Sequence, residues 1–137
     1  MTFMKRIHAL LILSCIMVSC VHTDFDEILL AKEDISLTVK GEEMMVFDRN
    51  SCQLGYNSST NEFRVYDDNL GNMFILTCNA HPSTEGQTLK ADLTWTTASS
   101  TKKRSGLNFT VKKISSDGLI WLWCDNERTG IIVKTLS

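Results

Sequence analysis

The chain has 137 residues, with 14 basic and 16 acidic side chains and a formal net charge of −2. This length allows one domain with one hydrophobic core and is too short for two. A nucleic-acid partner is not expected, because proteins that bind phosphates usually carry a basic excess, which this composition lacks.

A short positive region precedes an apolar run at the start of the chain. Lys5 and Arg6 are followed by ALLILSCIMVS, residues 9–19, which are apolar or small throughout. This layout is typical of a secretory signal peptide. The run is too short for a transmembrane helix, which needs about 20 apolar residues. We therefore expect residues 1–19 to direct export and to be removed.

The end of this run, MVSC at residues 17–20, resembles the lipobox of bacterial lipoproteins, in particular small lipoproteins of the Bacteroidota type. The resemblance covers only this terminal segment, and Met17 departs from the leucine that is usual at its position. It implies that cleavage follows Ser19 and that Cys20 carries a diacylglyceryl group. Each buried methylene contributes ~0.8 kcal/mol, so several acyl chains anchor a protein stably.

Three alternatives to lipidation at Cys20 stay open. Cys15 is a rival acceptor, although cleavage before it leaves an apolar region of only six residues, 9–14. The others are an unlipidated signal peptide cut near Ser19 and a buried apolar amino-terminal helix.

The residues after Cys20 bear on location and on the link to the domain. By resemblance to other lipoproteins, Val21 in place of aspartate implies the outer membrane, facing the periplasm or the cell surface. Asp24, Asp26 and Glu27 weakly resemble the acidic stretch that exports some gut-bacterial lipoproteins to the surface. We expect residues 20–34 to form a lipidated tether, in which the apolar patch at 28–31 is free or docks as a helical turn.

Residues 35–137 are expected to form a single all-β domain, because short β-rich runs alternate with turn signals. Eight or nine strands are predicted, at residues 35–40, 43–48, 51–56, 62–66, 73–79, 88–97, 107–114, 119–124 and 131–136. The links at 57–61, 67–72, 115–118 and 125–130 are rich in Asn, Asp, Ser and Gly, which favour hairpins. Such short links predict an antiparallel meander.

Alternation of apolar and polar residues gives several strands one buried face. Leu89, Leu93 and Trp95 lie on one side of their strand, and Phe63 and Val65 on one side of theirs. One buried face per strand predicts either a small barrel or a sandwich of two sheets.

Two predicted strands, 73–78 (MFILTC) and 119–124 (LIWLWC), are apolar on both faces. Trp121 and Trp123 point the same way. One interpretation places both in the core, with Ile120 and Leu122 beneath a loop, since large aromatic side chains mostly serve packing. The other makes Trp121 and Trp123 an exposed binding face for a sugar or a peptide.

Three cysteines follow Cys20, and an oxidising compartment would allow two of them to pair. The favoured disulfide joins Cys78 to Cys124, between sheets. A bond from Cys52 to Cys78 is less favourable, because hairpin register places them toward opposite ends of their strands. Three buried thiols are the remaining possibility, since spacing alone does not determine the connectivity.

The residues supply no constellation for a metal, a cofactor or catalysis. His22 lies in the tether and His81 beside the only proline, so neither a metal site nor a catalytic triad is predicted. Asp67, Asp68 and Asn69 are interpreted as a hairpin turn, because the spacing of a calcium loop is missing. The basic run at 102–104 is interpreted as a solvated Ser/Thr-rich loop. The protein is not expected to be an enzyme.

The sequence therefore predicts a lipid-anchored, non-enzymatic binding or structural module of the cell envelope that contacts a protein or a glycan. A lipocalin-like carrier of a small apolar ligand is the first alternative, since closed meanders can enclose one. An inhibitor of a secreted protease, acting through one hairpin loop, is the second.

Overall fold

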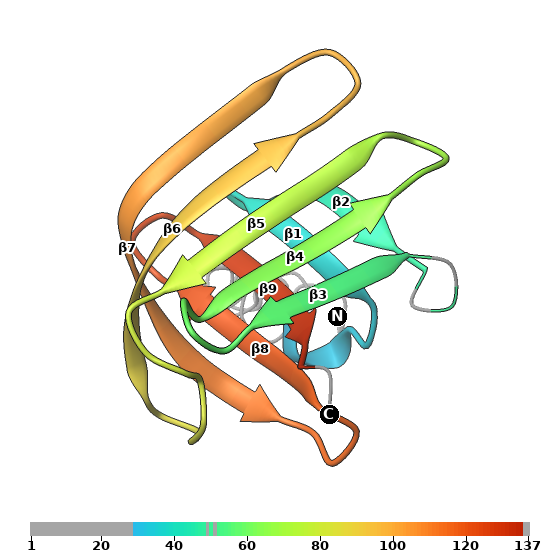
Figure 1. Cartoon of the computed structure of the whole chain (residues 1–137). Helices are drawn as coiled ribbons and strands as arrows, with labels where there is room; N and C mark the ends of the chain where they lie inside the picture. Colours follow the sequence, from blue (N-terminus) through green and yellow to red (C-terminus); the bar gives the residue numbers. More distant parts are fainter. Residues whose placement is uncertain (1–28, 49, 51, 136–137) are drawn as a thin grey trace, which may run out of the picture.

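The computed structural model describes residues 29–48, 50 and 52–135. The expectations for the leader and for Cys15 and Cys20 lie outside the described residues. Within them, nine strands form a single sheet (Figure 1). The strands are β1 (Ile35–Val39), β2 (Glu42–Phe47), β3 (Gln53–Asn57), β4 (Glu62–Asp67), β5 (Asn72–Cys78), β6 (Thr88–Thr96), β7 (Thr101–Ile114), β8 (Leu119–Cys124) and β9 (Thr129–Lys134).

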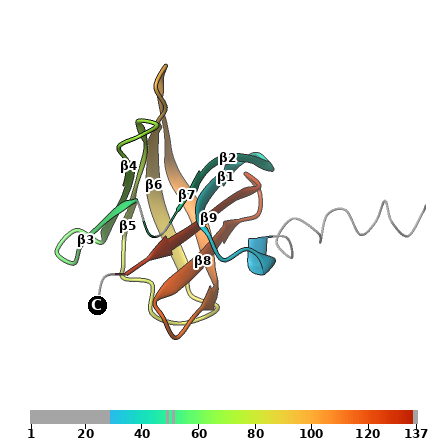
Figure 2. The ribbon, with the colours of Figure 1, turned by 90° about the vertical axis from the view of Figure 1, so that its right-hand side faces the viewer.

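Every pair of neighbouring strands is antiparallel, and the order across the sheet is β2-β1-β9-β8-β7-β6-β5-β4-β3. The prediction of an all-β antiparallel meander is confirmed. The sheet curls into a half-barrel, as Figures 1 and 2 show. β9 pairs with β1, whereas β2 and β3, which follow each other in the chain, form the two edges.

The predicted turn chemistry is present in the hairpins. Asn57 accepts a hydrogen bond from the backbone N–H of Ser59 on its side-chain oxygen, at 2.9 Å, in the β3–β4 turn. Asp67 does the same for Asn69, also at 2.9 Å, in the β4–β5 turn. Asn61 closes the first of these turns with a φ of 55°, in the left-handed region that asparagine tolerates.

The concave side of the curled sheet holds the core. Phe47 on the edge strand β2 packs edge-on against Phe74 on β5, with ring centroids 5.7 Å apart. This contact joins strands that are far apart in the sheet order and is made possible by the curl. The alternation predicted for β6 is confirmed, because Leu89, Leu93 and Trp95 are all buried.

β7 differs from the prediction, because it begins at Thr101 rather than at residue 107. The basic run, expected in a loop, therefore lies in a strand, where Lys102 pairs with Trp95 and Arg104 with Leu93. The Ser/Thr-rich composition favoured a loop, but pairing with β6 supplies each residue of this stretch with a cross-strand partner.

Candidate functional site

The two outer sides of the half-barrel differ in what covers them. The short helical segment at residues 29–31 lies against the outer side of β8 and β9, on the right of Figure 2, and continues into β1. The outer side of β3, β4 and β5, on the left of Figure 2, has no described segment over it. We call these the covered face and the open face.

Trp121 and Trp123 lie on the covered face and are only 1% and 5% exposed. Cross-strand partners lie on the same face of a sheet, and Leu122 pairs with the core residues Val111 and Ile131. Leu122 therefore points inward, and the tryptophans on either side of it point outward. The indole N–H of Trp121 donates to the backbone carbonyl of Lys32 at 2.9 Å. The alternative interpretation, an exposed binding face at these tryptophans, is wrong, because the segment before β1 covers them.

The core interpretation is confirmed for the two tryptophans, which are buried members of the hydrophobic core, but its placement of Ile120 and Leu122 needs correction. Ile120 and Leu122, expected beneath a loop, point into the concave core, whereas the tryptophans point outward under Leu29 and Lys32. When a strand is apolar on both faces, no polar residue marks the solvent side. The sequence therefore could not predict which side chains of this strand point into the core.

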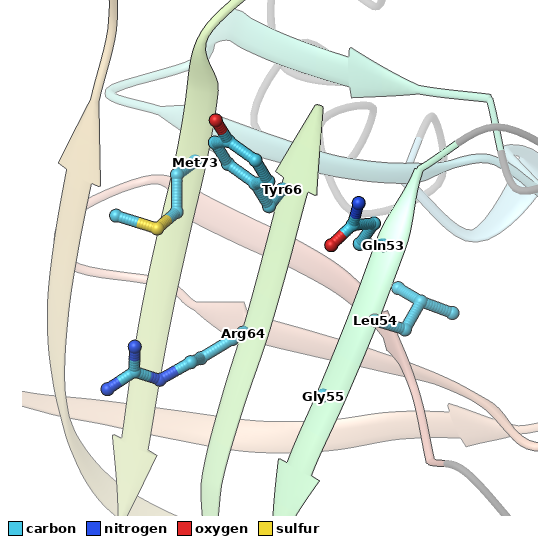
Figure 3. Close-up of a pocket in the computed structure, with 6 residues that line it drawn as sticks. All are labelled: Gln53, Leu54, Gly55, Arg64, Tyr66 and Met73. Atoms are coloured by element: carbon cyan, nitrogen blue, oxygen red, sulfur yellow. The ribbon is translucent and has the colours of Figure 1, made fainter. Parts of the chain in front are cut away.

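The open face carries a shallow hollow of about 340 Å³, shown in Figure 3. Its lining residues come from three neighbouring strands and are Gln53, Leu54, Gly55, Arg64, Tyr66 and Met73. Gly55 pairs with Arg64, and Tyr66 lies between Gln53 and Met73 in the register. The hollow exists because Gly55 has no side chain to fill it. A Cβ at this position would have only the Cβ of Arg64 within 4 Å, at 3.8 Å.

Strand alternation explains why these side chains face solvent. Phe63 and Val65 are buried, so Arg64 and Tyr66 of the same strand must point outward. Tyr66 is 36% exposed and presents an amphipathic ring at the rim of the hollow. Sequence reasoning recognised this alternation but missed the hollow. The available signal was a glycine inside a strand, which often marks a close approach by a ligand or backbone.

Polar groups around the hollow are held by neighbouring side chains. The Nε of Arg64 donates to Glu62 at 2.7 Å, and the guanidinium extends over β5 in Figure 3. The side-chain amide of Gln53 donates to Asp68 at 2.8 Å. These contacts orient a guanidinium and an amide at the rim, so the hollow combines an aromatic ring with hydrogen-bonding groups. Such a combination suits a polar ligand with an apolar side.

The three described cysteines are free thiols, so none of the candidate disulfides among them is formed. Gln53 pairs with Tyr66 and Tyr66 with Met73, which places Cys52 near the start of β5, whereas Cys78 ends that strand. β6 and β7 separate Cys78 from Cys124 on β8. Strands lie about 4.8 Å apart, so this separation exceeds the ~7 Å that a disulfide spans between Cα atoms.

The thiols are poor nucleophiles in their surroundings. Burial raises the pKa of Cys78 to about 12 and also raises the pKa values of Cys52 and Cys124. Because the thiolate is the reactive form, these cysteines remain protonated near neutral pH.

His81 has a partner that the sequence did not predict. Its Nδ1 lies 2.5 Å from the hydroxyl of Tyr56, and the two rings are 5.3 Å apart. Burial raises the pKa of Tyr56, and Cys78 adds to the effect. In the part of the chain that the structure describes, no three His, Cys, Asp or Glu side chains converge on a possible metal position. Nor does that part contain a helix long and apolar enough to cross a membrane.

Comparisons of the chain with protein-family models, with curated proteins and with solved structures find no match. Function is therefore inferred from the described surfaces, and the open face combines a hollow with an exposed aromatic ring and oriented polar groups.

Proposed function

We propose that the protein is a non-enzymatic binding module of the bacterial cell envelope, anchored to the outer membrane by lipid on Cys20, that binds a glycan on its open face. The observation that carries this proposal is the hollow beside Gly55, which Tyr66 and Arg64 also line. A sugar ring has an apolar face that can lie on an aromatic ring, and hydroxyls that can bond the neighbouring donors. The volume of about 340 Å³ is at the small end of the range for ligand sites.

The anchoring part of the proposal makes the open face accessible. Residues 21–28, eight in all, separate Cys20 from the docked Leu29. A chain of that length spans at most roughly 30 Å. The tether would join the domain at the covered face, and the open face lies on the opposite side of the half-barrel. A ligand in the periplasm or outside the cell could then approach without passing the lipid surface.

The concave side favours a surface site over a lipocalin-like carrier. Phe47 packs on Phe74, and Tyr56 packs on Phe63 with ring centroids 4.6 Å apart. These contacts fill space that a carrier needs for its ligand. The hollow on the open face, by contrast, is accessible from solvent and needs no rearrangement.

Glycan binding is tested with a panel of bacterial and host polysaccharides against the purified full-length chain. Tyr66→Ala removes the ring from the rim, and Leu70→Ala is the matched control, because Leu70 is an exposed apolar residue outside the hollow. We expect at least one polysaccharide to bind, with about tenfold weaker affinity after Tyr66→Ala and unchanged affinity after Leu70→Ala. Failure of every polysaccharide, or equal effects of both substitutions, would contradict the proposal.

The anchor is tested separately by mass spectrometry of the protein extracted from membranes. A diacylglyceryl mass on an amino-terminal Cys20 is the expected result, and Cys20→Ser should release the protein from the membrane fraction. An intact leader without lipid would contradict the anchoring part and leave the glycan part to its own test.

A further inference from the structure

The hairpin of β6 and β7 projects beyond the rest of the half-barrel (Figures 1 and 2) and carries a concentrated positive charge. Lys102, Lys103 and Arg104 are consecutive and exposed. β7 contains two further lysines and no acidic residue, although the whole chain has a net charge of −2. Within residues 29–48, 50 and 52–135, no acidic side chain forms a salt bridge with any of these three cations.

The same stretch of β7 has an unpaired edge. Residues 101–104 pair with β6 on one side, but β8 joins the other side of β7 only from Thr110, opposite Trp123. An unpaired edge presents a row of backbone N–H and C=O groups to solvent. The projecting hairpin therefore offers both backbone hydrogen bonds and positive charge at the same place.

The direction of these backbone groups follows from the hairpin turn. The N–H of Thr97 donates to the carbonyl of Ser100 at 2.9 Å, which makes these two residues a hydrogen-bonded pair. Antiparallel pairs alternate, so the next pair, Thr96 with Thr101, directs its backbone groups away from the partner strand. By the same alternation, Thr101 and Lys103 direct their N–H and C=O groups to the free edge.

A β-bulge limits the length of this edge. Gly106 has a φ of 67°, and its N–H donates to the carboxylate of Asp92 at 2.9 Å rather than continuing the ladder. The register of β6 and β7 shifts at this point. Since bulges bend a strand and interrupt pairing, the usable edge is the short stretch 101–104.

Charge decides which strand can pair there. A second copy of this edge would place lysine and arginine against lysine and arginine, and like charges opposite each other are destabilising. An acidic strand gains cross-strand ion pairs in addition to backbone hydrogen bonds. We propose that the free edge of β7 binds an extended acidic polypeptide segment of a partner protein as an added strand.

The register also defines the preferred sequence of that segment. Lys102 and Arg104 lie on the concave face, beside Trp95 and Leu93, whereas Lys103 lies on the convex face beside Thr94. Both faces of the edge are therefore positive. A run of consecutive acidic residues satisfies both faces, whereas alternating acidic and apolar residues satisfy only one.

The proposal is tested with a fluorescent eight-residue peptide containing three consecutive glutamates and the purified full-length chain. The variant Lys102→Glu with Lys103→Glu reverses two charges at the edge. The matched control, Lys90→Glu with Lys134→Glu, reverses two charges elsewhere in the sheet. We expect about tenfold weaker binding for the first variant and little change for the control, with affinity falling as salt rises. Equal losses for the two variants, or no binding to the unmodified chain, would overturn the proposal.

A second peptide separates strand addition from charge attraction alone. Methylation of alternate backbone nitrogens keeps the three glutamates but removes the N–H groups that pair with β7. The expected result is loss of binding, together with slower amide hydrogen exchange at Thr101 and Lys103 when the unmethylated peptide is bound. Equal binding of both peptides, or attachment to vesicles of anionic lipid with no peptide binding, would show that the edge attracts charge without pairing.

Discussion

The indole of Trp121 is joined to the backbone carbonyl of Lys32 by a 2.9 Å hydrogen bond, across 89 residues of sequence. Lys113 places its ammonium 4.7 Å from the centre of the same indole, and Lys32 forms an ion pair with Glu43 on β2. The segment before β1 is therefore held to Trp121 on β8 and to Glu43 on β2. This segment belongs to the folded domain rather than to a free tether.

The first prediction concerns the hydrogen bond from Trp121. Trp121→Phe keeps most of the ring but removes the donor, which should lower the free energy of unfolding by about 1 kcal/mol. Amide exchange in residues 29–35 should accelerate. Trp123→Phe is the matched control, because the indole N–H of Trp123 bonds Asp125 in its own hairpin. Similar exchange in the two variants would contradict a specific role for Trp121 in holding the segment.

The second prediction concerns the close packing of Leu29 on Gly130. A Cβ at Gly130 would lie 3.0 and 3.1 Å from the two Cδ atoms of Leu29, and 3.1 Å from a ring carbon of Trp123. Gly130→Ala should therefore lower the free energy of unfolding by about 1–3 kcal/mol through overpacking. The measurement is urea denaturation.

A double-mutant cycle identifies the group that is displaced. Leu29→Ala removes the two Cδ atoms, so the double variant with Gly130→Ala should lose less stability than the sum of the single losses, by more than ~0.5 kcal/mol. Additive losses would show that the added methyl is opposed by Trp123 instead.

The strands could be predicted from sequence because their signals are local. The alternation at Phe63 and Val65 and the turn residues Asn57 and Asp67 each act within a few positions. The pairing of β9 with β1 has no such signal, since it depends on how the whole sheet curls. The early start of β7 was missed for a related reason, because Lys102 becomes a strand residue through its partner Trp95.

Only part of the candidate site could be predicted from the sequence. The predicted burial of Phe63 and Val65 implies that Arg64 and Tyr66, which alternate with them, face outward. Their meeting with Gln53 and Met73 around Gly55 requires the register of three strands, which local patterns do not fix. A site assembled from cross-strand neighbours is therefore visible only once the pairing is known.

The third prediction concerns pH and Cys78. Its pKa is about 12 in the folded protein, against 9.0 for an ordinary thiol, because burial disfavours the thiolate. Between these values the unfolded chain loses the proton while the folded chain keeps it, so stability falls as pH rises. Below pH 9 this contribution is fully present. Each pH unit within the window should cost about 1.4 kcal/mol, as an upper limit for one group.

The check is urea denaturation of the unmodified chain and of Cys78→Ala at several pH values from 8 to 11. Cys78→Ala should lower stability at pH 8 through the lost side chain, and the difference between the two proteins should shrink as pH rises. A constant difference would contradict the raised pKa.

The fourth prediction separates stability from binding at Gly55. A glycine inside a strand costs roughly 0.5–1 kcal/mol relative to alanine, and β-branched residues are favoured in strands. Because an added Cβ at Gly55 meets only an ordinary contact at 3.8 Å, Gly55→Val should raise the free energy of unfolding by about that amount. The valine methyls would project into the hollow beside Tyr66 and should weaken glycan binding. Denaturation and binding measured on the same samples test whether stability rises and affinity falls. A stabilised variant with full affinity for the glycan would exclude the hollow as the ligand site.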